Sequence, residues 1–440
     1  MSIIIIRWRS KGSSYMTEFD RESPSSFTEK IKKNLSSPVL RTLMLAATVS
    51  TVGRGIFITL NVLYLTRFVE LSPIQVALIL LLAEGGGVIT SLLAGYLADR
   101  LSARLLVTFF IGIEGLGLIA YVFVNDFITA LAVSITVLAM HSSAESVRAA
   151  IIARAFTGED RVSTRAVLRT IGNVGIALGG GFATIPLIIN SATAYHALLV
   201  TAGATFMASA LQLKRLPSRV DAPSRTQPEN NMHPIGPTHK EGISPFRNPR
   251  YIGLSIFSGI FGMQFGLAEV GVPQWIVTHT DAPHIMVSVA LILSTLLVIA
   301  FQIPASRGTH DVRYAGRISS WAGIIMLLAC LLYAFSSKIS PVWAIVLLVG
   351  AVTFHTFAEI FSTSGTWGLS FELADHHRVG AYQGMFNMGF SLGAMFAPAV
   401  VTITALELGT VGWLILGAIF VVAGWGIRYV SRLADTTPKR

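Results

Sequence analysis

Ionisable side chains stand inside several long apolar runs of this sequence. Arg54, Glu84 and Glu114 lie near the middle of three consecutive runs, and Glu269 and Glu359 lie within two later ones. Placing such a group in hydrocarbon costs about 2.5–3.5 kcal/mol, so each one needs a partner or a function. Arg54 can pair with one of the first two carboxylates, which leaves the other to carry a proton. The predicted proton-coupling residues are Arg54, Glu84, Glu269 and Glu359, with a static ion pair as the alternative.

Polar side chains also recur at helical spacing. His141, Glu145 and Arg148 follow one another at i, i+4 and i+7, and His355 and Glu359 repeat the first step of this stripe. Because lipid would penalise every group on such a stripe, we expect the stripes to face an aqueous cavity. The predicted cavity residues are Asn61, His141, Gln264, His355, Gln383 and Asn387. For His141, a neutral, hydrogen-bonded histidine is the favoured interpretation.

A charged cluster is expected at the inner end of the fourth and fifth apolar runs. Glu145 and Arg148 approach that end, where Arg165 and Arg169 begin the next run. We predict that Glu145, Arg148 and Arg169 form a salt-bridged inner gate. A gate role is also the alternative for Glu359, whose segment HTFAE echoes the segment HSSAE that ends at Glu145.

The composition indicates which elements must hold these residues. Only 13% of the 440 residues are charged, against about 25% in soluble domains, and the mean hydropathy is +0.65. Apolar runs of about 20 residues, the length that crosses the hydrocarbon core of a bilayer, recur twelve times. We therefore predict an all-α membrane protein with twelve transmembrane helices. This composition excludes a soluble enzyme, a disulfide-rich secreted domain and a nucleic-acid binder.

Polar segments divide the chain into five parts. Residues 1–42 form a polar N-terminal tail, and residues 214–249 form the only long polar break, which has the composition of a linker. We predict six-helix bundles at 43–213 and 250–430 and a short C-terminal tail at 431–440. The HSSAE and HTFAE segments start 14 residues into the fourth and tenth predicted spans. This echo supports a 6+6 arrangement with pseudo-twofold symmetry.

The distribution of positive charge predicts the orientation in the membrane. Of the 33 Lys and Arg residues, all but three fall on one side of the predicted spans. Arg67 and Lys338 lie on the other side, and Arg54 lies inside a span. By the positive-inside rule, both termini and the linker are expected in the cytoplasm of a multi-pass cell-membrane protein. The net charge of +10 is therefore attributed to topology and not to nucleic-acid binding.

The loop after the second span carries a specific motif. The segment GYLADRLSAR is similar to the cytoplasmic loop signature GxLaDrxGrk of the major facilitator superfamily, with departures at Ser102 and Ala103. The twelve spans and the central linker agree with that family. The resemblance implies a conformational latch between the two halves, formed by Gly95, Asp99, Arg100 and Arg104. Asp99 can pair with the two arginines at the membrane interface.

Two further segments resemble those of bacterial drug and metabolite exporters. The fifth span, RTIGNVGIALGGGFATIP, is similar to a glycine-rich antiporter motif, with Gly175 and Gly179 in register and Gly180 where the motif has proline. Ordinary helix packing is the alternative for these glycines. The stretch ADHHRVGAYQGMFNMGFSLGAMFAP resembles the eleventh span and its preceding loop. The resemblance implies efflux, although the fourth span lacks the mid-helix arginine of many drug/proton antiporters. In this fold the third span lines the cavity less than the first, so Glu114 is a weaker candidate for proton coupling than Arg54 or Glu84.

These features predict a secondary active transporter. An enzyme is not expected, since the sequence shows no nucleophile–base arrangement, metal-ligand spacing or nucleotide loop. The expected activity is proton-coupled efflux of a small lipophilic drug or metabolite by alternating access, in a monomer without cofactor or metal. Its expected partners are the substrate, protons and the lipid bilayer. Proton-coupled uptake of a small polar nutrient is the first alternative, and a non-transporting membrane sensor is the second.

Overall fold

The computed structural model describes residues 37–189, 191–221, 242–337 and 339–435. Most of the two expected tails and the centre of the expected linker lie outside these ranges. Within them, twelve helices are long and apolar enough to cross a membrane. The prediction of a twelve-helix, all-α membrane protein is therefore confirmed.

The first half of the chain supplies six of these helices. They are α2 (Pro38–Arg67), α3 (Pro73–Ala98), α4 (Ala103–Ala120), α5 (Phe127–Ala155), α6 (Glu159–Ile189) and α7 (Ala192–Leu213). Polar side chains define where two of them begin. Ser72 and Asp126 accept hydrogen bonds from the backbone amides of Gln75 and Thr129, at 3.3 and 2.9 Å, and so satisfy amides that lack an intrahelical partner.

The second half supplies the other six. The first of them combines α8 (Pro249–Gly266), the π-helical turn η4 (Leu267–Gly271) and α9 (Val272–His279); the others are α10 (Met286–Ala305), α11 (Val312–Phe335), α12 (Pro341–Glu372), α13 (Val379–Val401) with the π-helical turn η5 (Thr402–Glu407), and α14 (Gly409–Asp435). The turn η4 ends two residues before Pro273, which has no amide hydrogen to continue the α-helical pattern. The widened turn contains Glu269.

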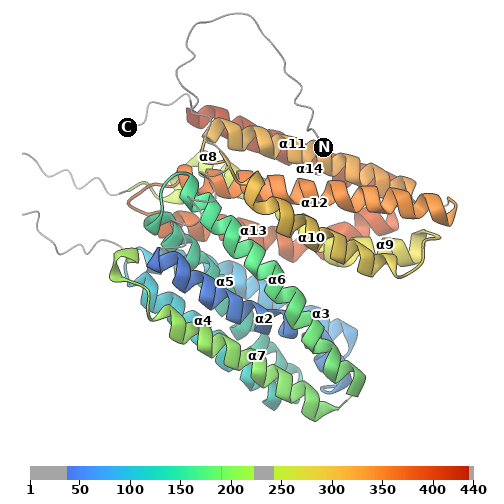
Figure 1. Cartoon of the computed structure of the whole chain (residues 1–440), viewed down its shortest axis with the longest axis horizontal. Helices are drawn as coiled ribbons and strands as arrows, with labels where there is room; N and C mark the ends of the chain where they lie inside the picture. Colours follow the sequence, from blue (N-terminus) through green and yellow to red (C-terminus); the bar gives the residue numbers. More distant parts are fainter. Residues whose placement is uncertain (1–36, 190, 222–241, 338, 436–440) are drawn as a thin grey trace, which may run out of the picture.

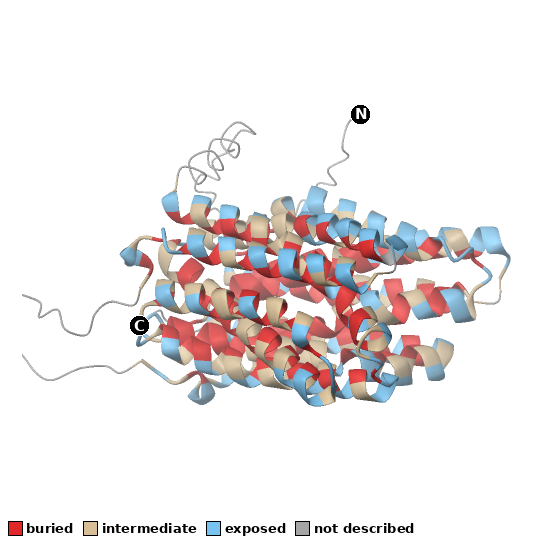
Figure 2. Cartoon of the chain, turned by 90° about the horizontal axis from the view of Figure 1, so that it is seen from below, coloured by how far each residue is buried: buried red, intermediate tan, exposed pale blue. Residues whose placement is uncertain are grey.

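The helices form two bundles, which meet at one end and diverge toward the other (Figure 1). We call the end at which α7 finishes and α8 begins the linker end. In the first bundle α2 packs against α6, α3 against α5 and α4 against α7; in the second, α8 packs against α13, and α11 against α12 and α14. Buried residues lie between the helices, and exposed residues cover the outside (Figure 2). Many of the exposed side chains are large and apolar, as lipid-facing surfaces require.

The two bundles touch through α3 and α13. A Cβ atom on Gly95 would clash with the backbone carbonyl of Gly380, and a Cβ atom on Gly380 would clash with the carbonyl of Gly95. The two backbones are therefore in direct contact, an approach that only glycine allows. This crossing brings Asp99, at the end of α3, to the start of α13.

Candidate functional site

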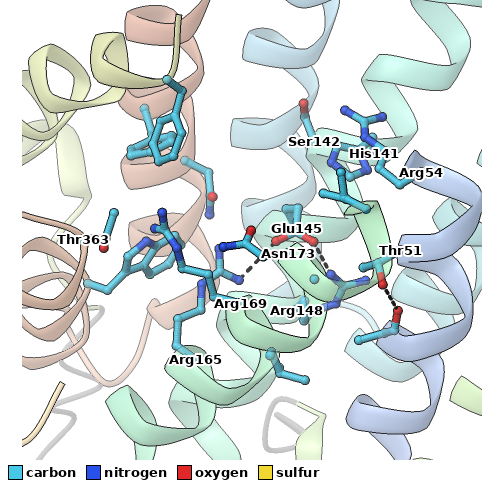
Figure 3. Close-up of a pocket in the computed structure, with 18 of the residues that line it drawn as sticks. Thr51, Arg54, His141, Ser142, Glu145, Arg148, Arg165, Arg169, Asn173 and Thr363 are labelled. Atoms are coloured by element: carbon cyan, nitrogen blue, oxygen red, sulfur yellow. Dashed lines mark hydrogen bonds and ion pairs between the residues drawn. The ribbon is translucent and has the colours of Figure 1, made fainter. Parts of the chain in front are cut away.

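A cavity of about 460 Å³ lies between the two halves. Its walls come from α2 to α7 of the first half and from α8, α10, α12 and α13 of the second. Apolar side chains make up part of the lining: Ile58, Leu138, Phe206, Phe265 and Phe390. Charged side chains make up another part: Arg54, Glu84, Glu114, Glu145, Arg148, Arg165 and Arg169. The charged residues of the lining all belong to the first half, whereas the second half presents aromatic and uncharged polar side chains to the same space, part of which is drawn in Figure 3.

Glu114 is the most deeply buried carboxylate of this cavity. Its side chain is 1% exposed, and its Oε1 lies 2.9 Å from His141 Nδ1 and 3.8 Å from Arg54 Nη1. Arg54 thus has the carboxylate partner that was expected, and His141 is hydrogen-bonded as expected. Glu84 lines the same cavity without a hydrogen bond or ion pair to any described residue. The surplus carboxylate is therefore Glu84, and the residue that the sequence ranked lower is the paired one.

The predicted inner gate is divided into two contacts. Glu145 pairs with Arg148 and, at 3.1 Å, with Arg165 of α6 (Figure 3). Arg169 does not join this cluster, because it pairs with Glu359 of α12 in the other half. The arginine of α6 that completes the Glu145 cluster is Arg165, whose guanidinium also lies 3.9 Å from the ring centre of Trp367 in the second half.

Asp99 forms a contact between the halves at the linker end. Its two carboxylate oxygens accept hydrogen bonds from the backbone amides of Gly380 and Ala381, both at 2.7 Å, where the positive end of the α13 dipole lies. Arg154 of α5 holds the same carboxylate at 2.6 Å. Burial raises the pKa of the Asp99 carboxyl, and these donors oppose that shift.

The expected pairing of Asp99 with Arg100 and Arg104 is wrong. Arg100 is exposed, and Arg104 turns away to donate a hydrogen bond to the carbonyl of Leu216, at 3.3 Å. The backbone amide of Arg104 is bound by Asp221 at 3.0 Å. The cause is the direction of α4, which leaves the loop toward the end of α7 and not toward α3.

Four of the six predicted cavity residues do not line this cavity. Asn61, Gln264, His355 and Gln383 are buried within their own half. Gln264 donates to Ser362 at 3.1 Å, and Gln383 donates to the carbonyl of Ser370 at 2.9 Å. Such stripes satisfy neighbouring helices as well as they would line water. His141 and Asn387 do line the cavity.

Glu269 lies in the π-helical turn η4 and is not part of the cavity lining. Its carboxylate is nevertheless within electrostatic reach of Arg54, Glu84 and Glu359. A π-helical turn changes the direction of every side chain in it, so an ideal-helix projection could not have placed this residue. The other three predicted proton-coupling residues are therefore the charged groups that act on Glu269.

Sequence reasoning assigned Arg169 to the gate but missed that it belongs to a row with Arg161 and Arg165. Arg161, Arg165 and Arg169 recur every four residues along one face of α6. Arg161 pairs with Glu372 of the second half at 3.5 Å, nearer the linker end than the pair of Arg169 and Glu359. The repeat itself is the signal that could have found them, because three arginines on one face of a membrane helix need anionic or aromatic partners from another element.

Comparison with known proteins agrees with this architecture. The sequence model of the Major Facilitator Superfamily matches residues 43–398. No curated protein matches the sequence. One similar solved structure is the human organic anion transporter MFSD10 (TETRAN), with a TM-score of 0.67 and 13% identity; the match covers 89% of this chain and 99% of that one. Another is a bacterial homologue of the iron transporter ferroportin in its outward-facing state, with a TM-score of 0.67 and 12% identity; the match covers 91% of this chain and 100% of that one. At such identities these likenesses concern the fold alone. With the family match over most of its length, the chain belongs to the major facilitator superfamily and is a multi-pass membrane transporter.

Proposed function

We propose that the chain is a proton-coupled secondary transporter that exports a small, partly apolar organic compound by alternating access. The observation that carries this proposal is the cavity between the halves, which combines apolar walls with ion-paired carboxylates. Two halves around one central cavity are the arrangement that rigid-body rocking requires. The contacts of Asp99, Arg161 and Arg169 hold the linker end closed, so the cavity is assigned to a state that opens at the opposite end.

The cavity lining favours an amphipathic cargo. Phe206, Phe265 and Phe390 supply aromatic surface, and four arginines supply positive charge. Organic anions are therefore the first class to test, and one structural neighbour is an organic anion transporter. A metal-ion cargo is not proposed, since the described residues contain no group of three or more His, Cys, Asp or Glu placed to hold one.

The proposed proton coupling rests on carboxylates that bind either a proton or an arginine side chain, but not both. In the proposed cycle, Glu84 and Glu359 take up protons from the cavity while it is open to the outside. Neutral Glu359 no longer holds Arg169, so the linker end opens and the protons leave to the cytoplasm as substrate binds Arg169 from that side. When ionised Glu359 pairs with Arg169 again, the linker end closes and the substrate is displaced to the outside. A lost charge–charge hydrogen bond of this kind changes a conformational equilibrium by about 1.5–3 kcal/mol. Glu114 stays with Arg54 and His141 and keeps the cavity wall in place.

The proposed setting is the cell membrane, with the linker end, both termini and the latch of Asp99 in the cytoplasm. The concentration of Arg and Lys at the linker end supports this orientation. A single chain contains both halves and the whole cavity, which supports a monomer as the working unit.

Proton movement in proteoliposomes tests the function. Purified protein is reconstituted with an imposed pH gradient, and lipophilic organic anions, lipophilic cations and polar nutrients are added in turn. We expect proton flux with lipophilic anions, at least about tenfold lower in Glu84→Gln and unchanged in Glu407→Gln, whose carboxylate lies in η5 outside the cavity. Proton flux with polar nutrients alone would contradict the proposed export and favour nutrient uptake. Ligand binding without any flux would favour a sensor and refute the transporter.

A further inference from the structure

A second pocket lies at the linker end of the second half, remote from the substrate cavity. It measures about 650 Å³ and is lined by Arg313 and Arg317 of α11 and by Arg428, Ser431, Arg432 and Asp435 of α14. These two helices run side by side along the outer edge of the second bundle (Figure 1). The pocket therefore opens where the end of the bundle meets the surrounding bilayer.

Close packing of the two helices fixes the backbone positions from which the four arginine side chains extend. A Cβ atom on Gly316 would clash with the side chain of Ser431, and one on Gly424 would lie 2.7 Å from the carbonyl of Ser319. Each helix contributes two arginines at i and i+4, which places both on one face. Small residues thus bring two arginine pairs onto one rigid platform.

Within the described residues, the charge of this platform is not balanced. Asp435 pairs with Arg313. Arg317, Arg428 and Arg432 have no carboxylate partner among the described residues. Like charges at i and i+4 on a helix repel each other, and facing pairs add to that repulsion. A bound anion that accepts several guanidinium hydrogen bonds would offset it, and phosphate oxygens match the arginine fork in geometry.

The matching corner of the first half is closed by the chain itself. The third and sixth helices there are α4 and α7, which correspond in order to α11 and α14. Arg104, at the start of α4, donates to the carbonyl of Leu216, and Asp221 binds both the Arg104 amide and the Ser102 hydroxyl. In the second half the acceptors of this kind are replaced by additional arginines.

Aromatic side chains beside the pocket face outward. Trp425 and Tyr429 on α14 are 63% and 64% exposed, and Trp321 on α11 is 58% exposed. They lie within four residues of the pocket arginines, toward the membrane interior for Trp321 and Trp425. Tryptophan and tyrosine at this level pack against the glycerol and upper acyl region of lipids. The surface thus offers an anion site at its end and apolar contact along its side.

From this arrangement we infer that the pocket between α11 and α14 binds the phosphate group of an anionic membrane phospholipid, whose acyl chains lie against Trp321 and Trp425. The ligand bridges two helices of the second half that take little part in the substrate cavity. The bound lipid stabilises the linker end of this half by neutralising its arginines. This inference is independent of the transported compound and of proton coupling.

Native mass spectrometry of the full-length protein in a zwitterionic detergent measures the site directly. The probes are phosphatidylglycerol and phosphatidylcholine, added separately at equal concentration. We expect phosphatidylglycerol to bind in preference, with affinity about thirtyfold lower in Arg317→Gln/Arg428→Gln, because each arginine contributes about fivefold. The control Arg41→Gln/Arg247→Gln removes two exposed linker-end arginines outside the pocket and retains the affinity.

A thermal scan separates binding from folding. Both double variants should unfold at temperatures close to that of the unsubstituted protein without anionic lipid, and phosphatidylglycerol should raise the melting temperature of all but the pocket variant. Equal loss of lipid binding in both double variants would overturn the inference, because general surface charge would then explain it. So would complete displacement of the lipid by millimolar inorganic phosphate, which would assign the pocket to a soluble anion.

Discussion

Arg169 of α6 and Glu359 of α12 form an ion pair that joins the two halves beside the central cavity. The two residues stand 190 positions apart in the chain, and Arg169 also lies in the cavity lining. A substrate anion that reaches Arg169 therefore competes with a carboxylate that holds the halves together. Binding and gating share one guanidinium group.

We predict that Glu359→Gln opens the linker end. The glutamine cannot form the charged pair, and the ratio of closed to open molecules should fall roughly tenfold or more. Spin labels at Thr157 and His376, two exposed loop positions on opposite halves, report the opening as a longer distance. Glu407→Gln is the control and should leave the distance distribution unchanged. An unchanged distribution in Glu359→Gln would remove this pair from the gate.

Glu114 and Glu84 should differ in what they contribute to stability. Glu114→Gln removes the carboxylate shared by Arg54 and His141 and leaves the Arg54 charge without its partner, at a cost of about 1–3 kcal/mol. Glu84→Gln breaks no hydrogen bond or ion pair within the described residues. Thermal unfolding in detergent should therefore show a lower melting temperature for Glu114→Gln only. Equal melting temperatures would contradict the pairing seen here.

The crossing of α3 and α13 should not tolerate a single methyl group. In Gly95→Ala the new Cβ atom meets the backbone of Gly380 and Gly384, which cannot move without separating the halves. We expect transport to fall at least about tenfold, with the linker end held open in the spin-label experiment. Gly85→Ala on the same helix is the matched control, because its Cβ atom meets nothing within 4 Å. Activity in Gly95→Ala equal to that of the control would argue against backbone contact in the working cycle.

Asp99 and Arg154 should act as a unit. Asp99→Asn weakens the cap on α13, and Arg154→Gln removes the cation that holds the same carboxylate. Because each substitution disables the other residue, the double variant should be less impaired than the sum of the single ones, with a coupling free energy of about 0.5–3 kcal/mol. The ratio of closed to open molecules measures it. Strict additivity would show that Arg154 acts elsewhere.

The sequence predicted the elements more fully than the contacts between them. Twelve apolar runs sufficed for the helices, because hydrocarbon thickness sets their length. The depth of Arg54, Glu84 and Glu114 was also readable, since rise per residue is constant along a helix. Which carboxylate meets Arg54 depends on the rotation of three helices, and hydropathy does not encode that rotation.

The cavity prediction was wrong at four of its six residues for a related reason. A polar stripe on an apolar helix indicates that the stripe avoids lipid, but a neighbouring helix satisfies that need as well as water does. Gln264 and Gln383 are examples, each bonded inside its own half. Glu359, the partner of Arg169, and the backbone amides that Asp99 binds come from the other half of the chain, so no local pattern contains these contacts.

The glycine crossing of α3 and α13 has an entropic consequence. Where side chains interlock, each closure of a contact immobilises rotamers, at about 0.5–1.5 kcal/mol for every flexible side chain. Gly95 and Gly380 have no side chain to immobilise, so this part of the contact closes without that cost and reopens without regaining disorder. Contact energy and charge therefore govern closure at this crossing. Because no side-chain rotamers are immobilised there, side-chain entropy should contribute little to the temperature dependence of the closed-to-open ratio.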